Sequence, residues 1–375
     1  MHSSIKIKIF HIVTDEKFIK SSTKFNSEMF DNQTFYVGHS TPEHVNTTCF
    51  HPSRKNIRAI LAVCNANSCI VVFHGLDVIK AYIANRLNRN TLVLWRFFGS
   101  ELYGKNKTEF YSIKTISVLN AQSQDVQVKL SKLWKKIHLW CKWGFQYKNE
   151  LQRFRPHYIL CTSEEEYSFI SEKYNHIPKL IIIPFTPLVQ SLPEWDKKEG
   201  LIIIGNSRSP YNNHTDIIDI IQSARFRKEF KYILPYNYGN EMRYAKKIKE
   251  HFPKELEVLF LENFLPRIEY DSLFKRAKII VINSYRQHAF GNVLMALYMG
   301  VNVYLNTRNP IYHFLKRNNI VVFSIEEFEH HINSGAFPDG ANVAAQNYNS
   351  FQTLASLQEL NQFHFTIVDK FKSLV

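Results

Sequence analysis

The sequence has few of the features that mark membrane-spanning, disulfide-rich or metal-binding chains. Its longest apolar runs, near 180–185 and 278–282, are the length of a strand, whereas a membrane-spanning helix needs about 20 residues. The five cysteines, at positions 49, 64, 69, 141 and 161, are odd in number and include no Cys-x-x-Cys pair. This pattern argues against a zinc site or a disulfide framework, and it favours free thiols in a reducing compartment.

The amino-terminal segment lacks the features of a secretion signal. MHSSIKIKIFHIV is too short and too interrupted by lysine for a signal peptide, and it instead resembles the first strand of a sheet. We therefore expect a cytoplasmic protein.

Three phosphate-binding signatures are also missing. The chain has no Gly-x-Gly-x-x-Gly and no Gly-x-x-x-x-Gly-Lys-[Ser/Thr], which argues against a dinucleotide-binding protein and a Walker-type NTPase. It has no Asp-x-Asp pair either. We therefore expect helix dipoles and Arg or His side chains, rather than a divalent ion, to neutralise a bound diphosphate, and we predict no metal and no cofactor.

What the chain has in excess is positive charge. Its 375 residues are 45% hydrophobic, which is ordinary for a globular protein of two domains, but the net charge is +14. Such a balance favours nucleic acid, an anionic membrane surface or phosphate-bearing substrates as partners. The densest basic block is 129–155, which contains Trp134, Trp140 and Trp143. This block is equally well interpreted as a helix in a bilayer interface and as a core-facing helix with a solvated basic face.

Apolar runs alternate with amphipathic segments along the chain, a pattern typical of parallel sheets with helical crossovers. The first half predicts strands at 5–13, 34–37, 69–73, 91–98, 158–161 and 180–184, and helices at 78–87 and 164–173. The second half predicts strands at 201–204, 232–234, 258–261, 277–282 and 302–305, and helices at 215–223, 240–251, 267–276 and 291–299. The predicted fold class is α/β, with two Rossmann-like domains whose parallel sheets face a central cleft.

A segment rich in proline and charge, 186–200, is the predicted linker. It separates an N-terminal domain at 1–185 from a C-terminal domain at 201–350. The last segment, 351–375, is a predicted C-terminal helix that could pack back on the N-terminal domain.

The segment LIIIGNSRSPYNNHTD, at 201–216, carries the clearest signature of an anion site. A buried strand ends at Gly205-Asn206-Ser207, and a polar loop leads into the apolar-periodic segment 217–221. A helix that begins there offers unpaired N–H groups and a positive dipole end to a phosphate. Small residues at Gly205 and Ser207 would let an anion approach the backbone.

A second loop of this kind, NSYRQHAFGN at 283–292, precedes a helix that begins near Gly291. Arg286 adds a positive charge, and Gln287 and His288 add hydrogen-bond donors. Two helix N-termini in one domain suit a diphosphate, although Gly291 is also explained by close packing of helix on strand.

Polar residues follow several other predicted strands at the same edge. They are His11, Thr14 and Asp15; His74, Gly75 and Asp77; Gly99–Tyr103; Pro235–Gly239; and Glu262–Leu265. Ligands of open α/β sheets bind beyond the carboxyl ends of the strands, so these residues are site candidates as a group. Each one alone is also explained as a helix cap or a buried hydrogen bond.

Three blocks of the second half resemble glycosyltransferase family 56, whose members act in the assembly of enterobacterial common antigen. The blocks are IIIGNSRSPYNNHTD, ILPYNYGN and ENFLPRIEYDSLFKRAKIIVINSYRQHAFGNVLMALYMGVNVYLNTRNP, in the family's order over roughly residues 200–315. Two positions depart from the family pattern: Glu101 replaces an aspartate, and His288-Ala289-Phe290-Gly291 replaces Gln-Gly-Ile-Gly.

The resemblance implies a GT-B fold and an inverting transfer from a dTDP-sugar to an undecaprenyl-diphosphate-linked saccharide. The sugar would be a deoxy-amino sugar of the 4-acetamido-4,6-dideoxygalactose type, transferred during the synthesis of a bacterial surface polysaccharide. Together with the basic block, it implies a peripheral protein on the inner face of the bacterial inner membrane.

On this hypothesis the C-terminal domain binds the donor. The diphosphate contacts would be Gly205, Asn206, Ser207, Asn213, Arg286, Gln287, Gly291 and Asn292, and the base and ribose contacts Tyr236, Tyr238, Phe264 and Leu265. The N-terminal domain would hold the acceptor, and one general base must take the proton of the acceptor hydroxyl. The candidates for this base, in order, are Glu101, Asp15 and His74, although Glu101 is also explained as a loop anchor. The acceptor or membrane contacts would be His11, Tyr103, Trp134, Trp140 and Trp143.

Two other interpretations remain open. One is a GT-B transferase that uses a UDP- or GDP-sugar for a capsule or O-antigen repeat. The other is a basic nucleic-acid-binding protein, although no recognised nucleic-acid motif is present and we expect no nucleic-acid partner.

Overall fold

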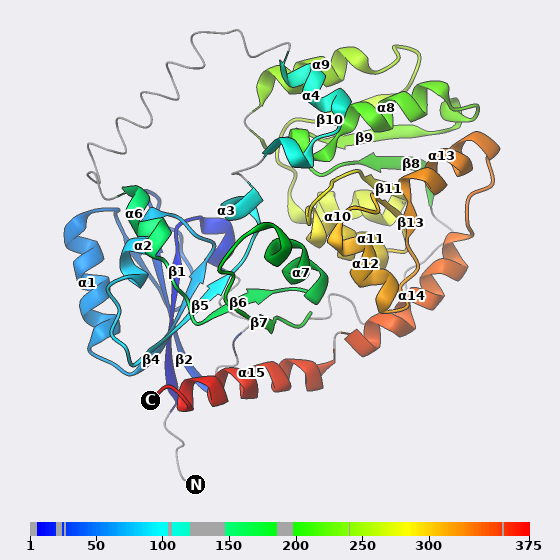
Figure 1. The fold of residues 1–375 in the computed structure, drawn as a ribbon. Coiled ribbons are helices and arrows are strands. Elements are labelled where there is room, and N and C mark those ends of the chain that lie inside the picture. The colour runs from blue at the N-terminus through cyan, green and yellow to red at the C-terminus, as the bar shows by residue number, and fades with distance from the viewer. Residues whose placement is uncertain are drawn as a thin grey trace. The chain divides into compact units, whose positions relative to one another are not determined.

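The computed structural model describes residues 6–19, 25, 28–103, 107–120, 147–185, 198–239, 241–354 and 356–375. The contacts between residues divide the chain into two compact units (Figure 1). The first unit contains the described residues of 1–105, 127–185 and 357–375, and the second unit contains those of 106–126 and 186–356.

The first unit is built on a seven-stranded parallel sheet with strand order β3-β2-β1-β4-β5-β6-β7. Its strands are β1 (Ile7–Val13), β2 (Phe30–Val37), β3 (Thr47–Phe50), β4 (Cys69–His74), β5 (Thr91–Arg96), β6 (Tyr158–Cys161) and β7 (Lys179–Ile182). Its helices are α1 (Arg54–Asn65), α2 (Val78–Ala84), α3 (Ser100–Tyr103), α6 (Tyr147–Arg153), α7 (Glu164–Lys173) and α15 (Leu357–Lys372). Every residue of β4 and β5 is buried, as expected for central strands of a parallel sheet that is covered on both faces.

The last helix, α15, supplies part of the core of the first unit. Its residues Phe363, Ile367 and Phe371 recur at every fourth position and are buried in one cluster with Ile70 and Leu92 of the sheet. A period of four residues places these side chains on one face of a helix, and that face covers the strands.

The second unit contains a six-stranded parallel sheet with strand order β10-β9-β8-β11-β12-β13. Its strands are β8 (Glu199–Ile204), β9 (Lys231–Pro235), β10 (Val258–Leu261), β11 (Ala277–Ile282), β12 (Asn302–Leu305) and β13 (Phe323–Ser324). Its helices are α4 (Ile113–Asn120), α8 (His214–Ser223), α9 (Met242–His251), α10 (Arg267–Arg276), α11 (Phe290–Tyr298), α12 (Pro310–Arg317), α13 (Ile325–Ser334) and α14 (Gly340–Leu354), with short 3₁₀ turns at Lys107–Phe110, Pro210–Asn212 and Arg227–Glu229.

The predicted limits of the first domain are wrong for residues 107–120. Helix α4 belongs to the second unit, where Val118 and Leu119 pack against the core that also contains residues of α8 and α9. The Oγ1 atoms of Thr115 and Thr215 lie 3.3 Å apart across the α4–α8 contact. The apolar face of an amphipathic helix does not identify the core that covers it, so position in the sequence was a poor guide here.

The predicted strands are all present, with ends that differ by a few residues, but the order of the sheets adds information. In the second unit the strand order reverses between β8 and β11, since β9 and β10 lie on one side and β12 and β13 on the other. Ligands of open α/β sheets bind beyond the strand ends at such a switch point. The two loops that leave this point are those predicted from the sequence, 205–213 and 283–289.

Candidate functional site

The loop after β8 folds tightly onto its own next turn. Gly205 has φ +68, and a Cβ atom there would lie 3.0 Å from both Asn212 Cγ and His214 Nε2. Glycine is therefore required for close packing within the protein as well as for its backbone conformation. Ser207 is fully buried, and its Oγ accepts hydrogen bonds from Asn212 Nδ2 at 3.2 Å and from the backbone N–H of Ser209 at 3.4 Å. Its hydroxyl shapes the loop, and only Asn206 among the three predicted residues keeps a partly exposed side chain.

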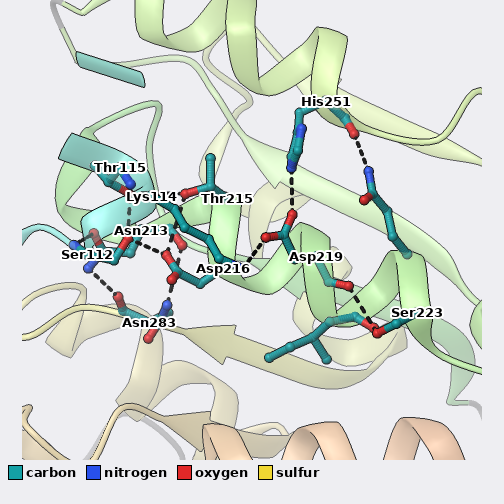
Figure 2. Close-up of polar contacts among 12 residues, drawn as sticks. Ser112, Lys114, Thr115, Asn213, Thr215, Asp216, Asp219, Ser223, His251 and Asn283 are labelled. Carbon is teal, nitrogen blue, oxygen red and sulfur yellow. Dashed lines mark hydrogen bonds and ion pairs between the residues drawn. The ribbon is translucent and has the colours of Figure 1, made fainter. Parts of the chain in front are cut away.

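Asn213 does not face a ligand, contrary to our expectation, because its side chain joins three segments of the second unit (Figure 2). Its Nδ2 donates to the carbonyl oxygens of Phe110 and Asn283 at 3.2 and 3.0 Å, and its Oδ1 accepts from the backbone N–H of Ser112 at 2.8 Å. Asn213 also has φ 44, a left-handed conformation that asparagine tolerates better than most residues.

Protein groups close the start of α8, and these contacts argue against the anion site that the sequence predicts there. His214 and Thr215, the first residues of the helix, are buried, and the backbone N–H of His214 donates to Tyr244 Oη at 3.3 Å. The carboxylate of Asp216 lies in the first turn and accepts from Ser112 Oγ at 2.5 Å (Figure 2). Burial raises the pKa of Asp216, and the Ser112 hydrogen bond opposes that shift. The carboxylate also interacts with the backbone N–H of Asp216, so a negative side chain already lies at this helix start.

The start of α11 is open instead. Its N-cap residue, Ala289, has φ 60 and supplies no side-chain hydrogen bond to the first turn. A Cβ atom added to Gly291 would meet no atom within 4 Å, so close helix–strand packing does not explain this glycine. The side chain of Asn292 is held by α10, because its Nδ2 donates to Tyr270 Oη at 2.8 Å. The start of α11 therefore offers a positive dipole end to an anion, and no side-chain cap covers it.

Arg286 brings a positive charge to the same loop. Its side chain is 7% exposed, and its guanidinium carbon lies 4.1 Å from the centre of the Tyr211 ring. The ring of Tyr111 lies 5.0 Å from that of Tyr211. His288 follows in the loop, and burial, then the charge of Arg286, hold its pKa well below the usual range. This histidine is therefore a neutral hydrogen-bonding group near neutral pH, and Arg286 carries the charge.

The expected base and ribose contacts separate into exposed and buried residues. Tyr238 and Phe264 are 45% and 76% exposed and can flank a ligand, and Leu265 is half-buried. Tyr236 cannot do so, because only 1% of it is exposed and its ring packs between His214 and Phe260.

Arg208, which the sequence did not single out, joins the loops after β8 and β9. Its Nε donates to the carbonyl oxygen of Gly239 at 2.5 Å, and its backbone N–H donates to the carbonyl oxygen of Tyr238 at 3.1 Å.

In the first unit, two of the predicted residues form a buried histidine pair. Asn32 uses its Nδ2 as a donor to backbone oxygens, so its Oδ1 accepts from His11 Nε2 at 3.0 Å. His11 Nδ1 then accepts from His74 Nε2 at 3.0 Å. Burial lowers the pKa of His11 to about 4 and holds the pKa of His74 well below its usual range, so both rings are neutral near pH 7. Because His11 is fully buried, a direct acceptor contact by this residue is not supported.

Glu101 lies in the short helix α3, beside Gly75 and Lys80. Its Oε1 accepts from the backbone N–H of Phe98 at 3.3 Å, and a Cβ atom on Gly75 would lie 3.5 Å from Oε1 and 3.7 Å from Lys80 Nζ. Burial raises the pKa of Glu101, while the backbone N–H groups and Lys80 oppose the shift. A carboxyl group with such a pKa suits general base catalysis near neutral pH.

The two other first-unit candidates differ in exposure. Asp15 is nearly half exposed and pairs with Lys17 at 2.7 Å. Tyr103 is fully buried between the rings of Phe97 and Phe169, so the expected contact with an acceptor is wrong. Trp134, Trp140 and Trp143, with most of the basic block, lie outside the described residues.

Comparison with known proteins identifies the family. A family model described as 4-alpha-L-fucosyltransferase glycosyl transferase group 56 matches residues 164–351, which is half of the chain. The chain belongs to glycosyltransferase family 56. No curated protein sequence matches it.

Solved structures with little sequence identity share the fold of this family 56 chain. Sucrose-phosphate synthase from Thermosynechococcus elongatus has a TM-score of 0.65 at 11% identity, covering 99% of this chain and 100% of that chain. Anabaena HepE, solved with UDP and glucose, has a TM-score of 0.62 at 12% identity, with 98% and 100% covered. WaaG, a glycosyltransferase involved in lipopolysaccharide biosynthesis, has a TM-score of 0.56 at 13% identity, with 97% and 99% covered. The fold is GT-B, and the family 56 chain is a sugar-transferring enzyme.

Two features bear on other partners of this family 56 enzyme. In the part of the chain that the structure describes, no three His, Cys, Asp or Glu side chains are grouped in a way that would hold a metal ion. None of the described helices combines the length and the hydropathy that crossing a membrane requires.

Proposed function

We propose that this enzyme transfers a deoxy-amino sugar of the 4-acetamido-4,6-dideoxygalactose type from a dTDP-sugar to a polyprenyl-diphosphate-linked saccharide, with inversion. The observation that supports a nucleotide-sugar donor is the pairing of Arg286 with the open start of α11 in one loop at the switch point of the sheet. A fixed positive charge and the positive end of a helix dipole both favour a diphosphate, and this loop supplies both.

The second unit would hold the leaving group. The positive end of the α11 dipole would face one end of the diphosphate, and Arg286 would balance its charge. Negative charge grows on the diphosphate as the bond from the sugar C1 to its oxygen breaks, so these groups act most strongly in the transition state. Tyr238 and Phe264 would flank the base, since both present exposed rings.

Glu101 would act as the general base on the acceptor. The acceptor hydroxyl oxygen forms the new bond to the sugar C1, the C1–O bond to dTDP breaks, and the hydroxyl proton passes to the Glu101 carboxylate. Only the ionised form can take this proton, so turnover should rise with pH through the raised pKa of this group. Asp15 is the next candidate, whereas the neutral, buried His74 is better suited to a supporting role.

A transferase that uses a UDP-sugar is the second candidate, because Anabaena HepE, which shares the fold, was solved with UDP and glucose. The acceptor would be a lipid-linked saccharide in the synthesis of a bacterial surface polysaccharide, reached at the inner face of the membrane through the basic block.

Thermal unfolding with dTDP, UDP and GDP separates these donors. A nucleotide at one hundred times its Kd stabilises the protein by about 2.7 kcal/mol, so we expect a clear rise in Tm with dTDP. Arg286→Gln should abolish this rise, and Arg58→Gln, an exposed change on α1, should leave it intact. A rise with UDP or GDP alone would overturn the dTDP proposal while the family assignment stands.

Turnover of Glu101→Gln tests the proposed base. With a dTDP-sugar donor and a polyprenyl-diphosphate-linked acceptor, we expect at least a hundredfold loss of kcat with donor binding unchanged. Glu43→Gln, an exposed carboxylate in the same unit, is the matched control. Near-normal turnover of Glu101→Gln would rule this residue out as the base.

A further inference from the structure

The second unit contains a pocket at the edge of its sheet opposite the loops already described. Lys198, Gly200, Lys278 and Asn302, which line it, lie at the starts of β8, β11 and β12. These strands are parallel, and the six residues of β8 span about 20 Å. The pocket is therefore a separate site, too far from Gly205 to share a ligand with it.

The lining of this pocket is rich in glycine. Its volume is about 490 Å³, which is in the range of small-molecule sites. Four of the twelve glycines in the chain line it: Gly200, Gly300, Gly335 and Gly340. A Cβ atom on Gly340 would make only ordinary contacts, 3.7 Å from the Gly300 carbonyl oxygen and 4.0 Å from Asn302 Oδ1.

Asn302, one of the lining residues, carries an unsatisfied acceptor. Its side chain is 4% exposed, and its Nδ2 donates to the carbonyl oxygen of Pro338 at 3.0 Å, which fixes the orientation of the amide. Its Oδ1 has no hydrogen-bond partner among the described residues. A buried acceptor without a partner is costly, and a hydroxyl or N–H group of a ligand would remove that cost.

Lys198 supplies the inner charge of the pocket. Its Nζ donates to the carbonyl oxygen of Phe274 at 2.8 Å, and burial lowers its pKa to about 7. The other charged groups of the lining are Lys278 and Glu229, which are exposed at the rim, and Asp339, whose Oδ1 accepts from the backbone N–H of Ala341. The 15-residue helix α14 also begins in the pocket, at Gly340, and the Asp339 carboxylate caps this start.

We propose that this pocket binds a monosaccharide phosphate, with Lys198 holding the phosphate and Asn302 Oδ1 accepting a hydrogen bond from a sugar hydroxyl. A partly buried lysine favours an anion, and a neutral acceptor among the lining residues favours a hydroxyl-bearing one. A bound phosphate stabilises the protonated form of Lys198, so binding takes up a proton and weakens as the pH rises above about 7.

Isothermal titration of the full chain with glucose 6-phosphate tests this proposal, with glucose and inorganic phosphate as comparison ligands. We expect saturable binding to the wild-type protein, weaker binding of both comparison ligands, and an affinity that falls about fivefold between pH 7 and pH 8 as Lys198 loses its proton. Lys198→Met should weaken binding at least tenfold and remove the pH dependence. Lys231→Met, an exposed lysine paired with Glu257, is the control.

A second variant separates loss of the site from loss of the fold. Gly340→Ala adds one methyl group over Asn302 Oδ1 at ordinary contact distances, so it should fold normally and still weaken the sugar phosphate at least fivefold. The nucleotide-induced rise in Tm should be unchanged in both variants, since that site lies at the other edge. The proposal is overturned if the wild-type protein does not bind glucose 6-phosphate, or if both variants bind it as tightly as the wild-type protein does. Neither result would affect the proposed function.

Discussion

Replacing Asn213 should destabilise the second unit more than most single changes, although the residue touches no ligand. Its amide donates two hydrogen bonds and accepts one. Ser112 and Phe110 lie 101 and 103 positions before it in the chain, and Asn283 lies 70 positions after it. In Asn213→Ala, the carbonyl oxygens of Phe110 and Asn283 and the N–H of Ser112 lose their partner in the interior.

The expected size of this effect follows from the contacts. Each buried polar group left without a partner costs about 1–3 kcal/mol, and alanine at φ 44 adds about 1 kcal/mol of backbone strain. Partial relaxation reduces the sum, so we predict a loss of about 3–5 kcal/mol. Asn213→Gly removes the same hydrogen bonds, but glycine adopts this left-handed backbone conformation without strain. It should therefore reduce the free energy of unfolding by about 1 kcal/mol less than alanine does. Asn213→Asp keeps the bond from Ser112 and should fall between the wild-type protein and alanine.

Local hydrogen exchange is the appropriate assay, because the described part of the second unit contains no tryptophan to report on it. Mass spectrometry of peptides from β8, β11 and α4 should show faster exchange than in the wild-type protein. The increase should be largest for Asn213→Ala, smaller for Asn213→Gly and smallest for Asn213→Asp. Peptides from β4 and β5 in the first unit supply an internal reference. Wild-type protection of all three segments in Asn213→Ala would refute the role assigned to this residue.

Three further predictions use the same kind of reasoning. Tyr236→Phe removes a buried hydroxyl that has no partner among the described residues, so urea unfolding should show equal or up to about 1 kcal/mol greater stability, with dTDP affinity unchanged. Gly291→Ala should leave stability within about 0.5 kcal/mol but weaken dTDP in a binding titration, whereas Gly205→Ala should cost about 2 kcal/mol or more in urea unfolding. Burial lowers the pKa of His11 to about 4 and that of His214 to about 3. Their contribution to the free energy of unfolding is therefore complete above pH 6.5 and is lost as the pH falls. Unfolding at pH 5 should show a loss of about 2 kcal/mol for each histidine, and equal stability at pH 5 and 7.5 would contradict this.

The central strands were predictable from the sequence, because the central strands of a parallel sheet are continuous apolar runs. Leu201–Ile204 and Ala277–Ile282 are of this kind, and both lie in the sheet as predicted. The edge strand β3 was missed, because its four residues are only partly buried and carry no such run. The position of Tyr236 was predictable in principle: Tyr232, Leu234 and Tyr236 alternate, which places all three on one buried face of a strand.

The closure of α8 was not predictable from local sequence. An unpaired helix start and one capped by a distant segment have the same local pattern, and the closing residue, Ser112, is 101 positions away from Asn213. The same limit applies to Tyr111, which meets Tyr211 only because α4 and its flanking turn fold into the second unit.

These contacts give the two predicted anion loops different roles. The loop at Gly205 is packed against its own next turn, and Asn213 then fixes the carbonyl oxygen of Asn283, where the second loop begins. Asn283 in turn accepts from Asn306 at 2.8 Å, so the start of the second loop is held from both sides of β11. The loop at Arg286 to Gly291 thus carries the positive charge and the helix start without a side-chain cap, whereas the first loop supports its position. A change in the first loop should therefore reduce donor binding only together with stability, and a change at Gly291 should reduce donor binding alone.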